Sequence, residues 1–287
     1  MPATSFEIKS SHLKVPGAQL YYEAQGSGPI LLMIPGGPTD AGIFATLGKC
    51  LIDQYTVVRY DPRGNSRSVL DGPAEDQNMD VHGDDAARLL EAMGGEPAFV
   101  LGSSGGAHIG LNLAARHPHR VRTLIAHEPP CMALLPDPLE QLAFGHDIYN
   151  TYITEGAGPA MQKFMVGAGI AASPMQRTGP PPPEAMEALA RVKGNVDYFL
   201  AHGFIPIGSY IPDVAALRAG PARIVVGVGE SSTGSLPFRT AVALAEQLGT
   251  EPVVFPGGHG GYNDNPEAFA EKLHETLRGT LVSPTHP

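Results

Sequence analysis

The chain has 287 residues, 43% of them hydrophobic and 17% charged, a composition typical of a globular protein with a sizeable buried core. Its formal net charge of −10 disfavours binding to nucleic acid and to anionic membrane surfaces, because both favour basic patches. The longest apolar run, residues 30–34, is too short to span a bilayer, and the first residues lack the apolar stretch of a secretory signal. Two cysteines make no disulfide framework, so we expect a cytoplasmic protein.

The first 130 residues alternate short apolar runs with stretches of helical periodicity. This alternation is typical of a mostly parallel sheet with crossover helices. The predicted strands in this part are residues 19–25, 30–34, 55–60, 98–101 and 121–126. Helices are predicted at residues 80–93, which end at two glycines, and at 107–116, which end before a proline.

The segment from residue 129 to 220 contains helical stretches but no convincing buried strand. Helices are predicted at 139–155, 160–167, 184–191 and 196–202, with a stiff proline-rich connector at 173–183. Alternation then resumes with strands at 223–228 and 252–255 and helices at 238–248 and 266–277, before a loose tail at 279–287. We therefore predict an α/β core with a mostly parallel, doubly wound sheet, formed by residues 1–128 and 221–287, and a helical cap or lid inserted at 129–220.

Residues 99–108 contain the pattern G-x-S-x-G between a predicted strand and a predicted helix. This context is typical of a nucleophile elbow, a sharp turn that strains the backbone of the serine and exposes its hydroxyl group. The residues two positions away must then be very small, and here they are Gly102 and Gly106. Because Ser104, and not Ser103, has glycines on both sides at this spacing, we predict Ser104 as the nucleophile.

A serine hydroxyl needs a base to remove its proton, so we expect a histidine further along the chain. His259 stands in a glycine-rich loop, residues 256–261, between the last predicted strand and the last predicted helix. The turn at residues 33–38 follows an apolar strand, and its two glycines allow backbone N–H groups to point at an anion, as an oxyanion hole requires. No histidine or cysteine spacing indicates a metal site, so we expect a mechanism without metal or other cofactor.

These segments together resemble the α/β-hydrolase fold superfamily over nearly the whole chain. The resemblance is carried by P-G-G-P at 35–38, D-P-R-G-N-S-R-S at 61–68, the elbow at Ser104 and the loop of His259. Two positions depart from the family pattern. Pro35 stands where relatives usually have a histidine, and Ser66 stands where they usually have a glycine. Neither departure removes a catalytic group.

The resemblance implies a role for each of these residues. Ser104 would be the nucleophile and His259 the base. The backbone N–H groups of Gly37 and Gly105 would form the oxyanion hole, and the segment 129–220 would be a lid over the site.

The sequence leaves more than one candidate for the acid that would orient the histidine. In most relatives the acid follows the strand matched here by residues 223–228, but this chain has Ser232 at the expected position, and Glu230 is displaced. Glu128 follows the strand predicted at 121–126. Some branches of the family, including serine-dependent lactonases that act on fungal resorcylic lactones, place a glutamate there. We predict Glu128 as the acid and keep Glu230 as the alternative.

The predicted activity is hydrolysis of a carboxylic ester or a lactone through an acyl-enzyme on Ser104. The run of residues 36–38 also resembles the oxyanion loop of proline iminopeptidases, but those aminopeptidases need clustered acids in the lid, and here the lid acids are few. Ser104 excludes the relatives with an aspartate nucleophile. Hydroxynitrile lyases, cofactor-independent oxygenases and a ligand receptor on a hydrolase scaffold stay open. The expected partner is a small-molecule ester or lactone, with no nucleic acid and no membrane; a homodimer is left open.

Overall fold

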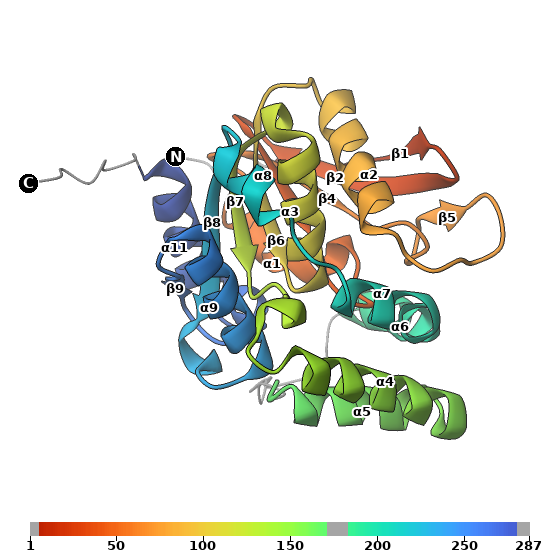
Figure 1. The fold of residues 1–287 in the computed structure, drawn as a ribbon. Helices are drawn as coiled ribbons and strands as arrows, with labels where there is room; N and C mark the ends of the chain where they lie inside the picture. Colours follow the sequence, from red (N-terminus) through yellow and green to blue (C-terminus); the bar gives the residue numbers. More distant parts are fainter. Residues whose placement is uncertain (1–5, 171–182, 280–287) are drawn as a thin grey trace, which may run out of the picture.

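A computed structural model describes residues 6–170 and 183–279 (Figure 1). The connector predicted at 173–183 and the tail predicted at 279–287 therefore lie outside the described residues, except for their positions 183 and 279. In the described part, nine strands form one sheet in the order β1-β2-β4-β3-β6-β7-β8-β9, with β5 paired to β2. Strand β2 is antiparallel to β1, β4 and β5, and the other neighbours are parallel. The prediction of a mostly parallel α/β sheet is confirmed.

The strands are β1 (Lys9–Val15), β2 (Ala18–Gly26), β3 (Ile30–Ile34), β4 (Thr56–Tyr60), β5 (Val69–Leu70), β6 (Ala98–Ser103), β7 (Val121–His127), β8 (Arg223–Gly229) and β9 (Val253–Phe255). The helices are α1 (Ala45–Lys49), α2 (Met79–Ala92), α3 (Gly105–Arg116), α4 (Pro138–Glu155), α5 (Ala157–Gly167), α6 (Pro183–Tyr198), α7 (Phe204–Gly208), α8 (Val214–Ala219), α9 (Leu236–Leu248), α10 (Gly261–Asp264) and α11 (Pro266–Arg278). The break predicted between residues 191 and 196 is wrong, because α6 runs through it into a wide turn, η4 (Phe199–Gly203). A single interior glycine, Gly194, destabilises a helix by only about 1 kcal/mol, which packing overcomes.

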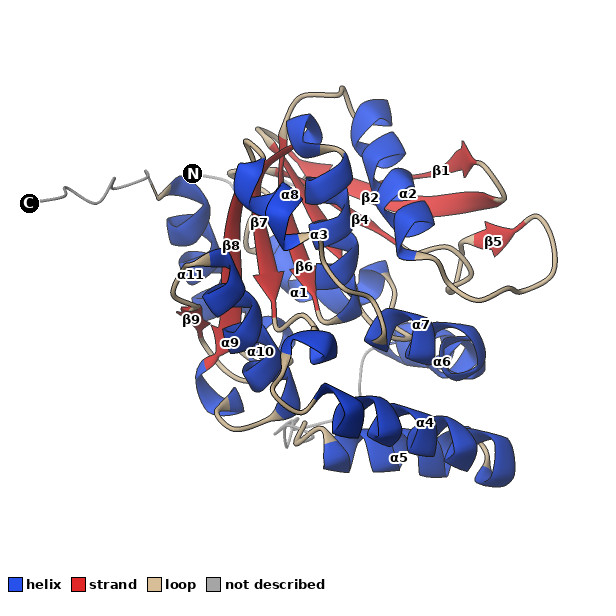
Figure 2. Cartoon of the chain, viewed as in Figure 1, coloured by secondary structure: helices blue, strands red, loops and turns tan. Residues whose placement is uncertain are grey.

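Helices cover both faces of the sheet (Figure 2). Along β3, Leu32 belongs to an apolar cluster that also contains residues of α2, α3, α8 and α9, whereas Leu31 belongs to a second cluster that contains residues of α1 and α11. Successive side chains of a strand point to opposite faces, so a strand between two helical layers needs apolar residues at every position. That requirement explains why the central strands are continuous apolar runs.

The connection between β7 and β8 carries α4 to α8. Figure 1 shows α4 to α7 beyond the carboxyl ends of β6 and β7. Four of these segments, α4, α5, η4 and α7, share a small apolar cluster of their own, whose buried members are Ile148, Ala160, Phe199, Leu200 and Phe204. We call residues 129–220 the helical insertion. In the described residues, no helix is both long and apolar enough to cross a membrane.

Among the residues that the structure describes, three histidines are buried: His82, His108 and His127. Burial lowers the pKa of His82 to about 3 and the pKa values of His108 and His127 to about 4, because the charged imidazolium loses its hydration. In the unfolded chain, an imidazole binds its proton near the reference pKa of about 6.5. Below that pH the unfolded state therefore binds more protons than the folded state, and the free energy of unfolding falls as the pH falls.

We expect each of these histidines to remove about 1.4 kcal/mol of unfolding free energy per pH unit between about pH 6 and pH 4.5. His127→Phe tests this expectation, because the ring of His127 already lies edge-on to Phe255 and Phe269, with centroids 5.8 and 5.4 Å away. In urea unfolding near pH 5, the variant's pH slope should be smaller by about that amount. A control at an exposed residue that does not titrate, Asn150→Ala, should keep the wild-type slope. An unchanged slope in His127→Phe would contradict the prediction.

Candidate active site

Ser104 lies at the sharp turn between β6 and α3. Its backbone adopts φ 53° and ψ −126°, a conformation that side chains rarely take, and its N–H donates to the carbonyl of His127 at 2.9 Å. A Cβ atom on Gly102 would lie 2.4 Å from the carbonyl oxygen of Gly106, and one on Gly106 would lie 2.1 Å from that of Ile34. The elbow therefore needs glycine at both positions, as the spacing predicts.

The turn after β3 passes close to this elbow. A Cβ atom on Gly36 would lie 2.8 Å from the nitrogen of Gly105, and one on Gly105 would lie 3.5 Å from the nitrogen of Gly37. The carbonyl of Gly36 accepts hydrogen bonds from the N–H and the hydroxyl of Thr39, at 3.2 and 2.5 Å. These bonds fix the peptide plane that contains the Gly37 N–H, because N–H and C=O point in opposite directions in a trans peptide. The two predicted oxyanion donors are thus brought together beside Ser104.

Glu128 and His259 are joined by a short hydrogen bond. Glu128 follows the last residue of β7 with φ 47°, and its side chain is fully buried. Nδ1 of His259 donates to Oε2 of Glu128 at 2.7 Å, and the N–H of Gly229 donates to Oε1 at 2.8 Å. Burial alone raises the pKa of Glu128. The bonds from His259 and Gly229, together with the nearby His127, outweigh burial and hold that pKa at about 2. Glu128 is therefore a carboxylate at neutral pH.

The alternative acid has a different environment. Glu230 begins the short helix η5 (Glu230–Ser232) after β8 and is exposed to solvent. Ser232, at the position where most relatives carry an aspartate, is buried. The neighbouring N–H of Ser231 donates to the carbonyl of Gly257 at 3.0 Å, so this loop supports the loop of His259 through backbone contacts. The structure brings Glu128 to His259, while the role of either glutamate in catalysis stays a prediction.

Ser104 and His259 face one cavity of about 250 Å³, which we call the catalytic chamber; Gly37 and Gly105 also line it. The other described residues that line it carry no charge: Gly36, Pro38, Thr39, Pro130, Met132, Met161, Phe164, Met165, Ile170, Phe199, Phe204, Ile207, Gly208 and Tyr262. A serine hydroxyl, a paired imidazole and two glycine N–H groups at an apolar chamber form an arrangement that can stabilise a developing oxyanion. In the described residues, no group of three or more His, Cys, Asp or Glu side chains is placed to hold a metal ion.

Comparisons with known proteins agree with this architecture. The family model described as the alpha/beta hydrolase fold matches residues 29–161. The uncharacterized hydrolase YraK of Bacillus subtilis (strain 168) is 38% identical over 276 residues, which cover 94% of this chain and 96% of that protein. The chain belongs to the α/β-hydrolase fold family.

Two further relatives of this α/β-hydrolase extend the comparison. A zearalenone hydrolase of Cladophialophora bantiana is 30% identical over 291 residues, covering 96% of this chain and 98% of that protein. A thermophilic esterase of Thermogutta terrifontis has a similar fold, with a TM-score of 0.75 and 21% identity, over 93% of this chain and 98% of its own.

Two buried polar residues beside the site of this hydrolase gave no signal in the sequence. His127 directly precedes Glu128, and both of its ring nitrogens lack a hydrogen-bond partner in the described residues. Asn195 lies on α6, more than 120 residues from the backbone that its side chain contacts. Both residue types are common on surfaces, so only tertiary contacts distinguish them. Ser66 gives a local sign of this contact, because it stands where the family usually has glycine. A residue other than glycine at positive φ needs support from another part of the chain, which Asn195 supplies.

Proposed function

We propose that this α/β-hydrolase is a cofactor-free serine hydrolase that cleaves a carboxylic ester or a lactone. Ser104 is the nucleophile, His259 the base and Glu128 the acid, with the N–H groups of Gly37 and Gly105 as the oxyanion hole. The 2.7 Å bond between Glu128 and His259, at the edge of the chamber that Ser104 also lines, is the observation that supports this proposal most directly.

In this mechanism, Ser104 attacks the acyl carbon while His259 takes its proton. The oxyanion that forms receives hydrogen bonds from Gly37 and Gly105, and the tetrahedral intermediate collapses to an acyl-enzyme as His259 protonates the leaving alcohol. Water then attacks the acyl group, with His259 again as base. The second tetrahedral intermediate collapses by breaking the ester bond to Ser104, as His259 returns the proton to Ser104 and the carboxylic acid leaves. Glu128 accepts from Nδ1, so that Nε2 faces Ser104 as an acceptor.

The lining of the catalytic chamber supports a neutral, apolar substrate. Zearalenone hydrolases are 30% and 26% identical to this chain over more than nine-tenths of its length, and zearalenone is a macrocyclic lactone. An aminopeptidase needs a carboxylate for the substrate ammonium group, and none is present among the described residues that line the chamber. An ester or lactone therefore fits better than an amino-terminal peptide.

The helical insertion supplies part of this chamber. Met161, Phe164 and Met165 line it from α5, and Phe199 and Phe204 line it from η4 and α7. We propose on this basis that residues 129–220 are a cap over the site, inserted into a core of residues 1–128 and 221–287.

A panel of nitrophenyl esters, aromatic esters and macrocyclic lactones tests the function, with an aminoacyl nitroanilide as the aminopeptidase arm. Multiple turnovers on an ester or lactone, abolished by a serine-directed sulfonyl fluoride, would support the proposal. A single slow acylation without turnover would indicate a receptor instead. Turnover confined to the nitroanilide would favour the aminopeptidase.

A further inference from the structure

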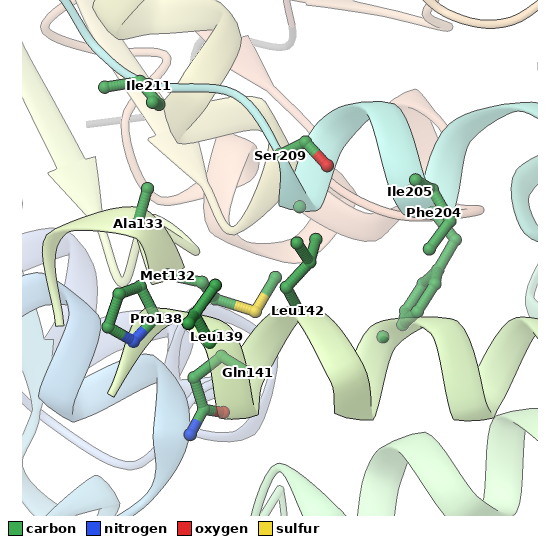
Figure 3. A pocket seen from close by; sticks show the side chains of 12 residues that line it. Met132, Ala133, Pro138, Leu139, Gln141, Leu142, Phe204, Ile205, Ser209 and Ile211 are labelled. Atoms are coloured by element: carbon green, nitrogen blue, oxygen red, sulfur yellow. The ribbon is translucent and has the colours of Figure 1, made fainter. Parts of the chain in front are cut away.

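A second cavity of about 250 Å³ lies between η3 (Met132–Leu134), α4 and α7; we call it the outer chamber (Figure 3). Its described lining is apolar apart from the side chains of Gln141 and Ser209. No charged side chain is among these lining residues, so the chamber suits a neutral, apolar group.

The outer chamber shares three wall residues with the catalytic chamber: Met132, Phe204 and Gly208. A Cβ atom on Gly208 would lie 2.7 Å from Cε of Met132, so the methionine methyl group rests directly on this glycine. Methionine is unbranched and has three rotatable side-chain bonds, so it changes shape at low energetic cost. Met132 is therefore the shared wall residue whose side chain is most easily moved.

We propose that the outer chamber is the distal subsite of the catalytic chamber, with Met132 as the movable partition. It takes the far apolar part of a bulky ester or lactone, an inference that rests on the proposed function. The size of the chambers favours this reading. The catalytic chamber, at about 250 Å³, is smaller than the roughly 300–1,000 Å³ of most ligand pockets, and the two chambers joined fall within that range.

Gly145→Leu fills the outer chamber without touching the catalytic one. Gly145 lines only the outer chamber, and a Cβ atom there would lie 3.7 Å from Cδ1 of Ile205, an ordinary contact. Leucine also favours the interior of α4 more than glycine does. The matched control is Ala143→Leu, which adds a leucine at an exposed position of the same helix.

The readout is kcat/KM on nitrophenyl esters from acetate to laurate. Gly145→Leu should lower the laurate-to-acetate ratio about tenfold, Met132→Ala should raise it severalfold, and Ala143→Leu should leave it unchanged. An unchanged ratio in Gly145→Leu, with the same melting temperature, would overturn the inference while leaving ester hydrolysis intact. Failure of the wild-type protein to turn over any ester or lactone would overturn the proposed function itself, and the inference with it.

A separate observation concerns α6 and the turn that carries Gly37. Asn195 on α6 is only 5% exposed. Its Nδ2 group donates to the carbonyl of Pro38 at 2.9 Å and to Oγ of Ser66 at 2.8 Å, while its Oδ1 accepts from the N–H of Ser66 at 2.7 Å. Ser66 has φ 51°, so this amide also holds a strained residue in place.

The same turn has two further supports. Asn65 is buried, and its Nδ2 donates to the carbonyl of Thr39 at 3.0 Å. Arg191 lies one helical turn before Asn195, on the same face of α6, and its Nε donates to Oδ2 of Asp40 at 2.6 Å. Residues 36–40 are therefore held between the loop 61–68 and the helical insertion.

We infer that Asn195 is a positioning residue for the oxyanion hole, acting through Pro38 on the N–H of Gly37. Under the proposed function, α6 then helps to build the site as well as to cover it. A misplaced oxyanion donor weakens binding of the transition state more than binding of the substrate, because the donor must lie about 2.7–3.1 Å from the oxyanion.

Asn195→Ala should lower kcat about 10- to 100-fold on an acetate ester with little change in KM. A boronic acid that forms a tetrahedral adduct on the serine should lose affinity in parallel with kcat. The control Asn150→Ala, at an exposed position of α4, should leave kcat, KM and this affinity unchanged. A kcat within threefold of wild type in Asn195→Ala would overturn the inference.

Adding Ser66→Gly to Asn195→Ala distinguishes a positioning role of Asn195 from a general loss of stability in Asn195→Ala. Glycine takes positive φ without strain, so adding Ser66→Gly to Asn195→Ala should recover much of any lost melting temperature. The kcat of the double variant should stay low, because the Pro38 carbonyl still lacks its donor. Recovery of kcat together with the melting temperature would show a merely structural role and overturn the inference.

Discussion

Ser104→Ala is expected to abolish turnover of esters and lactones while leaving the protein folded. In serine proteases, removal of the nucleophile lowers kcat by about 10⁶, and only about 10³- to 10⁴-fold catalysis over water remains from binding and the oxyanion hole. Alanine and serine are equally strained at φ 53°, so the backbone energy of the elbow does not change. The melting temperature should therefore stay within a few degrees of wild type.

The neighbouring serine provides a matched control. Ser103 is buried at the end of β6, and the sequence pattern does not give it glycines on both sides at spacing two. Ser103→Ala should keep turnover and reaction with a sulfonyl fluoride, whereas Ser104→Ala should lose both. If Ser104→Ala keeps more than a few per cent of the wild-type kcat, acyl transfer through this residue is excluded.

The sequence predicts the central sheet and the elbow because both depend on local patterns. A strand buried on both faces must be apolar throughout, and the elbow needs glycines at fixed spacing. Strand β1 was not predicted, because most of its residues are exposed and polar. Its position is set by antiparallel pairing with β2. Nothing in its own composition distinguishes it from a polar loop.

Parts of the candidate site depend on contacts between distant segments. Asn195 acts on Ser66 and Pro38 across more than 120 residues, so its spacing along α6 carries no sign of this contact. The choice between Glu128 and Glu230 also depends on contacts between distant segments. Both glutamates follow a strand, but β7 lies between β6 and β8 in the sheet, and only the folded arrangement brings Glu128 within 2.7 Å of His259.

The first test of the acid is Glu230→Gln, because the kcat of this variant is the baseline against which the loss in Glu128→Gln is compared. Glu230 is exposed at the start of η5, so an amide there changes one surface charge. Its kcat should fall by less than about tenfold, since screened surface charges contribute little. A much larger loss in this variant than in Glu128→Gln would place the acid after β8 instead.

Glu128→Gln should lower kcat by about 10⁴, the loss seen when the corresponding acid of serine proteases becomes an amide. The backbone N–H of Gly229 holds one side-chain oxygen, so the amide group of the glutamine would face Nδ1 of His259. Two donors cannot pair, and the imidazole must then carry its proton on Nε2, where it cannot accept the proton of Ser104. Because the folded protein holds the pKa of Glu128 at about 2, the carboxylate stabilises the fold at neutral pH, so the variant's melting temperature should fall, and kcat is measured well below that temperature. Small kcat losses in both glutamate variants would mean that neither side chain orients His259, and the triad proposed here would be wrong in its third member.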